Sequence, residues 1–266
     1  PIDSFTMIPG PHKNVNIVRP LGGKIDKKTK EKLISQDTYK WDGEKYYYDW
    51  EPLKTILRNV LEQTEVYQLV LDNPSWAFQR GLNLEGRNEV DTYGNPWAPN
   101  DPEAWATYIK AMLNELIKTY GKERVREWRY CVGREIGTPG HWRAGEEAFF
   151  AHYKNTEQAI RDVLPEAQVG THLLWGSARD SYGQNFIPWC KENGVRYDFL
   201  GISYYPVYTS KKKVDMGHVY NSDIAPLIEL PDWNKEASFE FHEYALIEAM
   251  IHHQAIRSPA LQRNVF

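Results

Sequence analysis

The sequence alternates short apolar segments of strand length with amphipathic segments of helix length, and this alternation limits the possible folds more than any other feature. Such alternation favours an α/β fold in which helices separate the strands of a parallel sheet or barrel. The predicted strands are residues 15–21, 66–71, 128–134, 168–174, 198–205 and 238–244.

Helical segments lie between several of these strands. The clearest begins at Asp101, whose side chain suits an N-cap, and continues with Pro102 in the first turn. It ends before Gly121, the residue type that most readily terminates a helix. A loop over residues 81–100 interrupts the regular spacing, and loops of that length usually carry function or are mobile. The predicted helices are residues 51–63, 101–121, 146–164, 186–192 and 246–256.

The sequence has 266 residues, which is enough for one large domain with a complete core, although length alone would also permit two domains. We therefore predict a single (β/α)8 TIM-type barrel, the catalytic domain, over residues 1–266. A barrel of this type needs eight strands. The pattern lacks one strand at each end, so we expect the sequence to be incomplete or truncated at its first and last strands.

Charge and hydropathy argue against two classes of partner. At a net charge of −4 the chain has no basic surplus for nucleic acid or an anionic membrane. No apolar run is long enough to span a bilayer, and residues 1–5 lack the basic and apolar regions of a signal peptide. Cys131 and Cys190 are predicted to be buried thiols. No cluster of ligands has the spacing of a zinc site, so we expect neither metal nor cofactor.

Two glutamates, Glu135 and Glu243, stand at the ends of predicted strands, 108 residues apart. Catalytic groups of a barrel come from these carboxyl ends. A pair of carboxyl groups about 5–5.5 Å apart can cleave a glycosidic bond with retention, one as acid/base and the other as nucleophile. Glu240 is the alternative nucleophile, but alternation along a strand places it on the face opposite to Glu243.

The residues around both glutamates resemble glycoside hydrolase family 39 and, more broadly, the clan A (α/β)8 glycosidases. The resemblance rests on Tyr120-Gly121, Trp128, Glu135 and His141-Trp142, on Ser203-Tyr204-Tyr205-Pro206, and on Glu243-Tyr244. It extends over residues 15–244. The resemblance implies that Glu135 is the acid/base and Glu243 the nucleophile. It also implies that Tyr205 lies beside the nucleophile.

Arg134 departs from the clan's pattern, which commonly has Asn immediately before the acid/base. An Asn side chain donates and accepts hydrogen bonds, whereas Arg only donates and keeps its positive charge. One interpretation is that Arg134 binds an anionic substituent, a sulfate or uronic carboxylate, through bidentate contacts. The other is that Arg134 pairs with a neighbouring carboxylate and orients Glu135 or keeps it ionised.

Further substrate-binding candidates follow other strand ends, in a chain that has 10 Trp and 17 Tyr. Aromatic faces can stack on the C–H faces of sugar rings, but each of these tryptophans fits core or loop packing equally well. The histidines are expected to hydrogen-bond sugar hydroxyls or to hold carboxylates rather than to bind metal, and Arg19 either reaches the barrel mouth or forms a surface ion pair. The candidates are Trp76, Trp142, Trp175, His141, His242 and Arg19.

These observations predict a retaining glycoside hydrolase that cleaves a β-glycosidic bond in an oligo- or polysaccharide, with an anionic galactan as one substrate class. A polysaccharide substrate would imply a secreted or periplasmic protein. Two alternatives stay open: a non-catalytic carbohydrate-binding protein on a degenerate barrel, and a metal-assisted hydrolase on the same scaffold. The sequence does not determine the oligomeric state.

Overall fold

The structure, a computed structural model, describes residues 17–62, 65–66, 68–82, 93–138, 140–174, 182–203 and 238–241. The chain divides into two compact units. The first comprises Pro1–Arg134 and Thr138–Val169, and the second comprises Glu135–Gly137 and Gly170–Phe266.

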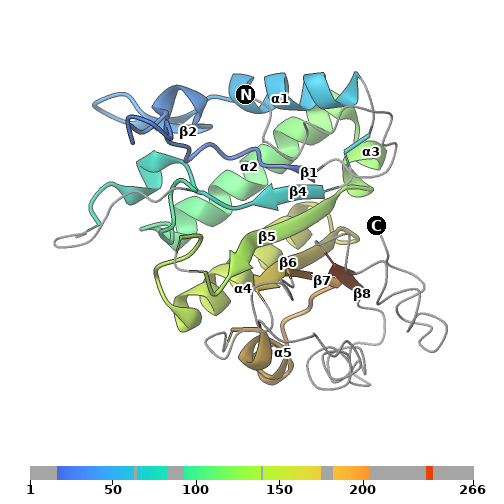
Figure 1. The fold of residues 1–266 in the computed structure, drawn as a ribbon. Helices are drawn as coiled ribbons and strands as arrows, with labels where there is room; N and C mark the ends of the chain where they lie inside the picture. Colours follow the sequence, from blue (N-terminus) through green and yellow to red (C-terminus); the bar gives the residue numbers. More distant parts are fainter. Residues whose placement is uncertain are drawn as a thin grey trace, which may run out of the picture. The chain divides into compact units, whose positions relative to one another are not determined.

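The sheet of the first unit has three parallel strands, β1 (Ile17–Val18), β4 (Gln68–Leu71) and β5 (Arg129–Ile136, up to Arg134), which pair in chain order. Figure 1 shows the arrows of β4 and β5 running side by side in the same direction. All four residues of β4 are buried, and Arg134 is the one residue of β5 that is not. Continuous burial is expected of a parallel strand covered on both faces.

Four helices accompany these strands: α1 (Glu51–Leu61), α2 (Pro102–Tyr120), α3 (Lys122–Arg126) and α4 (Glu146–Val163). The Asp101 side chain caps α2 by accepting from the backbone N–H groups of Glu103 and Ala104, at 3.0 and 2.9 Å. This confirms the N-cap expected from the sequence. Helices α2 and α4 pack together, and their contact includes a hydrogen bond from Trp105 Nε1 to Thr156 Oγ1 of 2.8 Å.

The second unit contains β6 (Gln168–Leu174, from Gly170 onward), β7 (Phe199–Ser203) and β8 (Ser238–Phe241), again parallel and paired in chain order. Gly170 is needed because a Cβ atom there would overlap the backbone oxygen of Phe199. Helix α5 (Tyr182–Asn193) precedes β7 and begins four residues earlier than its periodicity predicts.

A two-stranded antiparallel hairpin, β2 (Tyr39–Trp41) and β3 (Tyr46–Tyr48), belongs to the first unit and was not predicted. Two short 3-10 helices also belong to that unit: η2 (Ile34–Gln36) and η3 (Trp76–Gln79). The hairpin turn is stabilised by the Asp42 side chain, which accepts from the backbone N–H groups of Glu44 and Lys45, both at 2.9 Å. An Asp-Gly pair between aromatic runs is a known hairpin signal, so the sequence contained the cue.

Most predicted elements are confirmed within the described residues. The six predicted strands are all found, although β5 continues to Ile136 instead of ending at Arg134. Both cysteines are buried thiols, and burial raises the pKa of Cys131. The helix predicted at residues 246–256 lies outside the described residues. Among the described helices, none combines the length and apolar character that crossing a bilayer requires.

Candidate active site

Glu135 is the next-to-last residue of β5, at the carboxyl end of the strand, and it is 9% exposed. Its backbone has a φ of +44°, in the left-handed region that non-glycine residues rarely adopt. Gly133 and Gly137, two residues to either side, also have positive φ values of 77° and 109°. A buried carboxyl group in a strained backbone at a strand end is the type of feature that clusters at functional sites.

Arg19 follows β1 and forms an ion pair with Asp72, which follows β4. Arg19 Nε donates to Asp72 Oδ1 at 2.8 Å, and Nη2 donates to Asp72 Oδ2 and to Asn73 Oδ1. The Arg19 and Asp72 side chains are only 13% and 7% exposed. Arg19 therefore reaches the carboxyl edge of the first unit's sheet and forms a shielded bidentate pair there, rather than an ordinary surface ion pair.

Asn73 extends this pair into the following loop. Its backbone has a φ of +47°, and its Nδ2 donates to the backbone oxygen of Asn95 at 3.1 Å. The backbone N–H of Asn95 donates to Gly23 O at 2.8 Å, and Asn95 Nδ2 donates to Pro74 O at 2.7 Å. The loops after β1 and β4 are thus joined to residues 93–97 by hydrogen bonds that are mostly buried.

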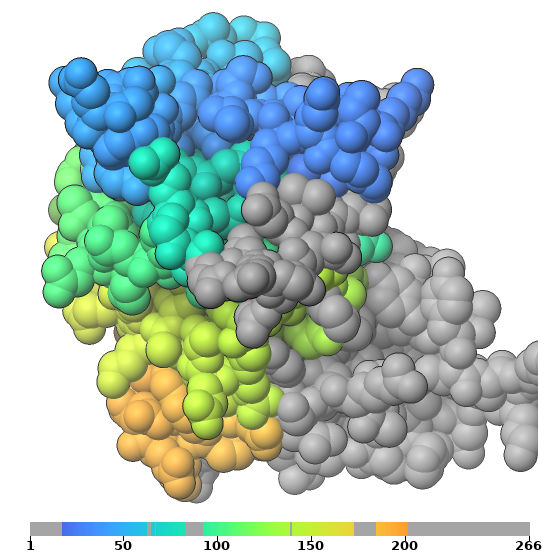
Figure 2. Space-filling view, turned by 90° about the vertical axis from the view of Figure 1, so that its left-hand side faces the viewer, coloured from blue at the N-terminus to red at the C-terminus, as the bar shows by residue number. Residues whose placement is uncertain are grey.

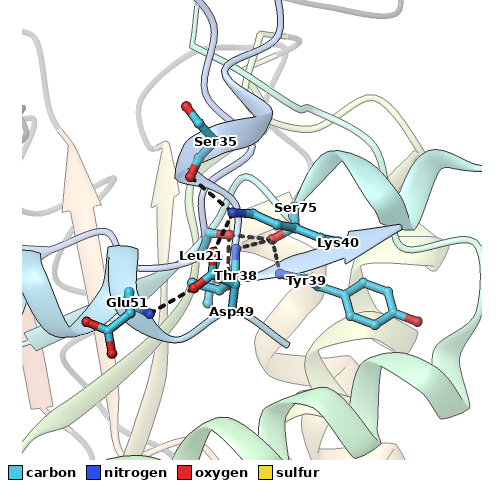
Figure 3. Close-up of polar contacts among 8 residues, drawn as sticks. All are labelled: Leu21, Ser35, Thr38, Tyr39, Lys40, Asp49, Glu51 and Ser75. Atoms are coloured by element: carbon cyan, nitrogen blue, oxygen red, sulfur yellow. Dashed lines mark hydrogen bonds and ion pairs between the residues drawn. The ribbon is translucent and has the colours of Figure 1, made fainter. Parts of the chain in front are cut away.

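The hairpin is fixed to the same two strand-end loops through Ser75 (Figure 3). Ser75 Oγ donates to Leu21 O at 2.5 Å and accepts from the backbone N–H groups of Thr38 and Tyr39, both at 3.2 Å. Asp49 Oδ2 accepts from Lys40 Nζ at 2.6 Å, and Asp49 Oδ1 accepts from the backbone N–H of Glu51 at 3.1 Å, which ties the hairpin to the start of α1.

Asp37 makes a second connection between these loops. Its two carboxyl oxygens accept from the backbone N–H groups of Gly23 and Trp76, each at 2.8 Å, and the residue is fully buried. Burial raises the pKa of Asp37 to about 7, although the two backbone donors and the lysines Lys40 and Lys32 act in the opposite direction. Sequence reasoning missed Asp72 and Asn73, which only their position after a strand distinguishes, and Asp37, which follows η2 rather than a strand.

The described aromatic and histidine candidates are mostly enclosed. Trp76 is 5% exposed, with its Nε1 donating to Lys24 O at 2.8 Å, and Trp142 is 7% exposed, with its Nε1 donating to Gly145 O at 2.8 Å. Both tryptophans are therefore packed against the protein, which is the alternative to sugar stacking.

His141 is 6% exposed and stacks on Tyr93 with a centroid separation of 4.2 Å, while Tyr93 itself is 45% exposed. Tyr93 is a candidate stacking surface that the sequence did not single out.

The remaining candidates lie outside the described residues. They are Glu243, His242, Tyr205 and Trp175. Their predicted roles therefore stay predictions. Arg134 is described and is half-buried in β5, immediately before Glu135. In the part of the chain that the structure describes, no group of three or more potential ligands is placed to hold a metal ion.

Parallel strands separated by helices, with a buried glutamate at a strand's carboxyl end, are typical of the (β/α)8-barrel glycoside hydrolases. The family model "Glycosyl hydrolases family 39" matches residues 78–226, more than half of the sequence. The chain belongs to glycosyl hydrolase family 39.

Characterised relatives agree with this family. The chain is 46% identical over 242 residues to an alpha-1,4-L-rhamnosidase of Formosa agariphila, a match that covers 89% of this chain and 49% of the relative. It is 33% identical over 119 residues to a beta-xylosidase of Geobacillus stearothermophilus, covering 44% of this chain and 23% of that enzyme. The chain thus spans about half the length of the rhamnosidase, and its match to the xylosidase covers a smaller share of that enzyme.

A family 39 beta-xylosidase from Caulobacter crescentus has a similar solved structure. The TM-score is 0.61 at 19% identity, and the match covers 86% of this chain and 52% of that one. At this level of identity the likeness concerns the fold. It confirms the TIM-type barrel class expected from the sequence, of which six strands lie in the described residues.

Proposed function

We propose that this chain carries the catalytic centre of a retaining glycoside hydrolase, with Glu135 as acid/base and Glu243 as nucleophile. The observation that supports it most is the buried carboxyl group of Glu135, held at the carboxyl end of β5 in a strained backbone. In the first step Glu243 attacks the anomeric carbon while Glu135 protonates the leaving oxygen. In the second, Glu135 deprotonates a water that releases the sugar from Glu243.

The substrate we propose is an oligosaccharide with α-1,4-linked L-rhamnosyl units. The support is the alpha-1,4-L-rhamnosidase, whose similarity covers twice as much of this chain as that of the beta-xylosidase. Neither name points to the β-linked anionic galactan expected from the sequence. An anionic substituent on the sugar is supported by Arg134 alone, through its charge and its place next to Glu135.

Hydrolysis assays on the wild type, Glu135→Gln and Glu243→Gln test this function. The panel consists of α-1,4-linked L-rhamnosyl oligosaccharides, neutral and sulfated, and xylo-oligosaccharides, with product stereochemistry followed by NMR. We expect the wild type to retain the configuration. On oligosaccharides, whose leaving group is a sugar, we expect each variant to lose at least about a thousandfold in kcat/KM. Inversion, or full activity in either variant, would contradict the assignment of that glutamate.

Arg134→Asn tests the anionic substituent separately. If Arg134 binds a sulfate or carboxylate, the variant should lose activity on the charged oligosaccharide while keeping activity on the neutral one, because Asn carries no charge. Equal activity of the wild type and the variant on the charged substrate would exclude this role.

A further inference from the structure

The hairpin presents a set of stacked aromatic rings that the proposed catalytic centre does not use. Phe78 of η3 stacks on Tyr39 of β2 at a centroid distance of 4.3 Å and an interplanar angle of 26°. Tyr39 in turn stacks on Tyr46 of β3 at 5.0 Å and 12°. Phe78 and Tyr39 are 1% and 7% exposed, whereas Tyr46 is 40% exposed. Tyr46 is therefore the outer ring of the stack, supported from behind by two buried rings.

An arginine lies over Trp41, the neighbour of this outer ring. Trp41 lies opposite Tyr46 in the hairpin register and meets its ring edge-on at 4.7 Å. The guanidinium of Arg80, an exposed residue, lies over the Trp41 ring at 4.0 Å. No described residue accepts a side-chain hydrogen bond or ion pair from Arg80. Trp41 therefore contacts both the guanidinium and the Tyr46 ring, and it connects the N–H donors of Arg80 to the outer end of the stack.

The hairpin is also held at a place that suits binding of a long substrate. Ser75 and Asp37 fix it to the loops that follow β1 and β4, at the carboxyl edge of the first unit's sheet. In Figure 1, β2 lies on the side toward which the arrow of β4 points, and in Figure 2, which faces that side, the blue segments lie at the surface. The loops at this edge are the ones that bind substrates in barrel enzymes.

We propose that Tyr46 and Arg80 form a carbohydrate-binding platform that takes a pyranose unit of a longer glycan chain. The flat face of Tyr46 stacks on the C–H face of the sugar ring, and its hydroxyl group remains in water. Arg80 donates hydrogen bonds to the sugar hydroxyls next to that ring. Because the stack is already packed, little side-chain entropy is lost on binding. The proposal rests on the proposed function only for the choice of sugar.

Tyr47 supplies a matched control. It is adjacent to Tyr46 and equally exposed, at 41%, but strand alternation places it on the opposite face of the hairpin, outside the stack. The test measures binding of α-1,4-linked L-rhamnosyl and xylo-oligosaccharides to the full chain carrying Glu135→Gln, by saturation-transfer NMR and calorimetry. We expect Tyr46→Ala to weaken binding about three- to tenfold and Tyr47→Ala to leave it unchanged.

Two further variants guard against a folding artefact. Tyr46→Phe keeps the ring and should retain most of the affinity, whereas Arg80→Gln, which leaves the stack intact, should weaken binding to a similar extent as Tyr46→Ala. Equal affinities for Tyr46→Ala and Tyr47→Ala, or no binding of either oligosaccharide, would overturn the platform. So would a change in self-association on Tyr46→Ala, which would make the face a contact between copies of the chain. Hydrolysis by the wild type decides the proposed function independently of these binding results.

Discussion

Glu135, the proposed acid/base, has an unfavourable backbone conformation. A non-glycine residue in the left-handed region costs about 1–2 kcal/mol, so its φ of +44° implies that the surrounding structure holds it there. Gly133 and Gly137 adopt positive φ values without this cost, since they lack a Cβ atom. The sequence pointed to Glu135 through its position at the end of a strand, but the identity of one residue does not reveal its backbone angle.

A pair of substitutions tests this strain. We expect Glu135→Gly to be more stable than Glu135→Ala by about 1 kcal/mol, because glycine adopts the left-handed conformation freely. Arg134 does not have a positive φ, so there we expect Arg134→Ala to be more stable than Arg134→Gly, by about 0.5–1 kcal/mol. Urea unfolding of the four variants measures both differences. The same order at the two positions would mean that the backbone at Glu135 is not strained.

The Arg19–Asp72 pair should contribute strongly to stability. With both side chains largely shielded from water, Asp72→Asn leaves the guanidinium without a full countercharge and should destabilise the chain by about 3 kcal/mol. Arg19→Lys should also destabilise it, because an ammonium group cannot make both contacts of the bidentate pair. A double-mutant cycle measured by thermal unfolding gives the coupling, and additive effects would show that the pair is not a unit.

At the scale of elements, strand and helix positions were largely predictable and connections were not. Buried parallel strands and capped helices such as α2 leave continuous apolar runs and end signals. The Asp42-Gly43 turn signal was missed because the strands on either side of it are only three residues long and pack on the distant residues Phe78 and Tyr108. In the candidate site, the position of Glu135 at the carboxyl end of a strand was predictable, whereas the partners of Arg19 depend on contacts 53 and 54 residues apart.

The hairpin's attachment should depend on Ser75. Ser75→Ala removes one donor and leaves the buried N–H groups of Thr38 and Tyr39 without their acceptor, which should cost about 2–4 kcal/mol. Amide hydrogen exchange should accelerate in residues 38–48 more than in β4. Asp101→Ala, which removes only the N-cap of α2, should cost about 1 kcal/mol and leave hairpin exchange unchanged. Uniform acceleration across the chain after Ser75→Ala would argue against a local role.

At the scale of the whole molecule, two titratable groups, the half-buried His152 and the buried Asp37, predict how stability changes with pH. His152 lies between the rings of Trp105 and Trp142, at 4.9 and 5.2 Å, and burial lowers its pKa to about 3. The unfolded chain binds a proton at His152 below about pH 6.5, and the folded chain does not. The free energy of unfolding should therefore fall as pH decreases from 6.5 toward 3. His152→Phe should flatten this dependence in urea unfolding curves.

Asp37 contributes with the opposite sign. Its pKa of about 7 in the folded chain exceeds the ordinary aspartate value near 3.8, so its contribution is complete below pH 3.8 and is lost as pH rises through 7. Whatever its effect on overall stability, Asp37→Asn should remove this decline. Difference curves of each variant against the wild type, taken from pH 4 to pH 8, separate the two groups. Curves that stay parallel to the wild type would show that the residue does not titrate between those limits.

The hairpin's mode of attachment has a consequence for how such an enzyme can change its specificity. Ser75 and Asp37 hold residues 38–48 and the strand-end loops largely by backbone atoms, so few of the anchoring bonds depend on the side chains that the hairpin exposes. Exposed residues such as Tyr46 and Tyr47 can therefore be replaced without losing the hydrogen bonds that anchor the hairpin. At the proposed platform, glycan preference could therefore be diversified or engineered without changing the residues that anchor the hairpin.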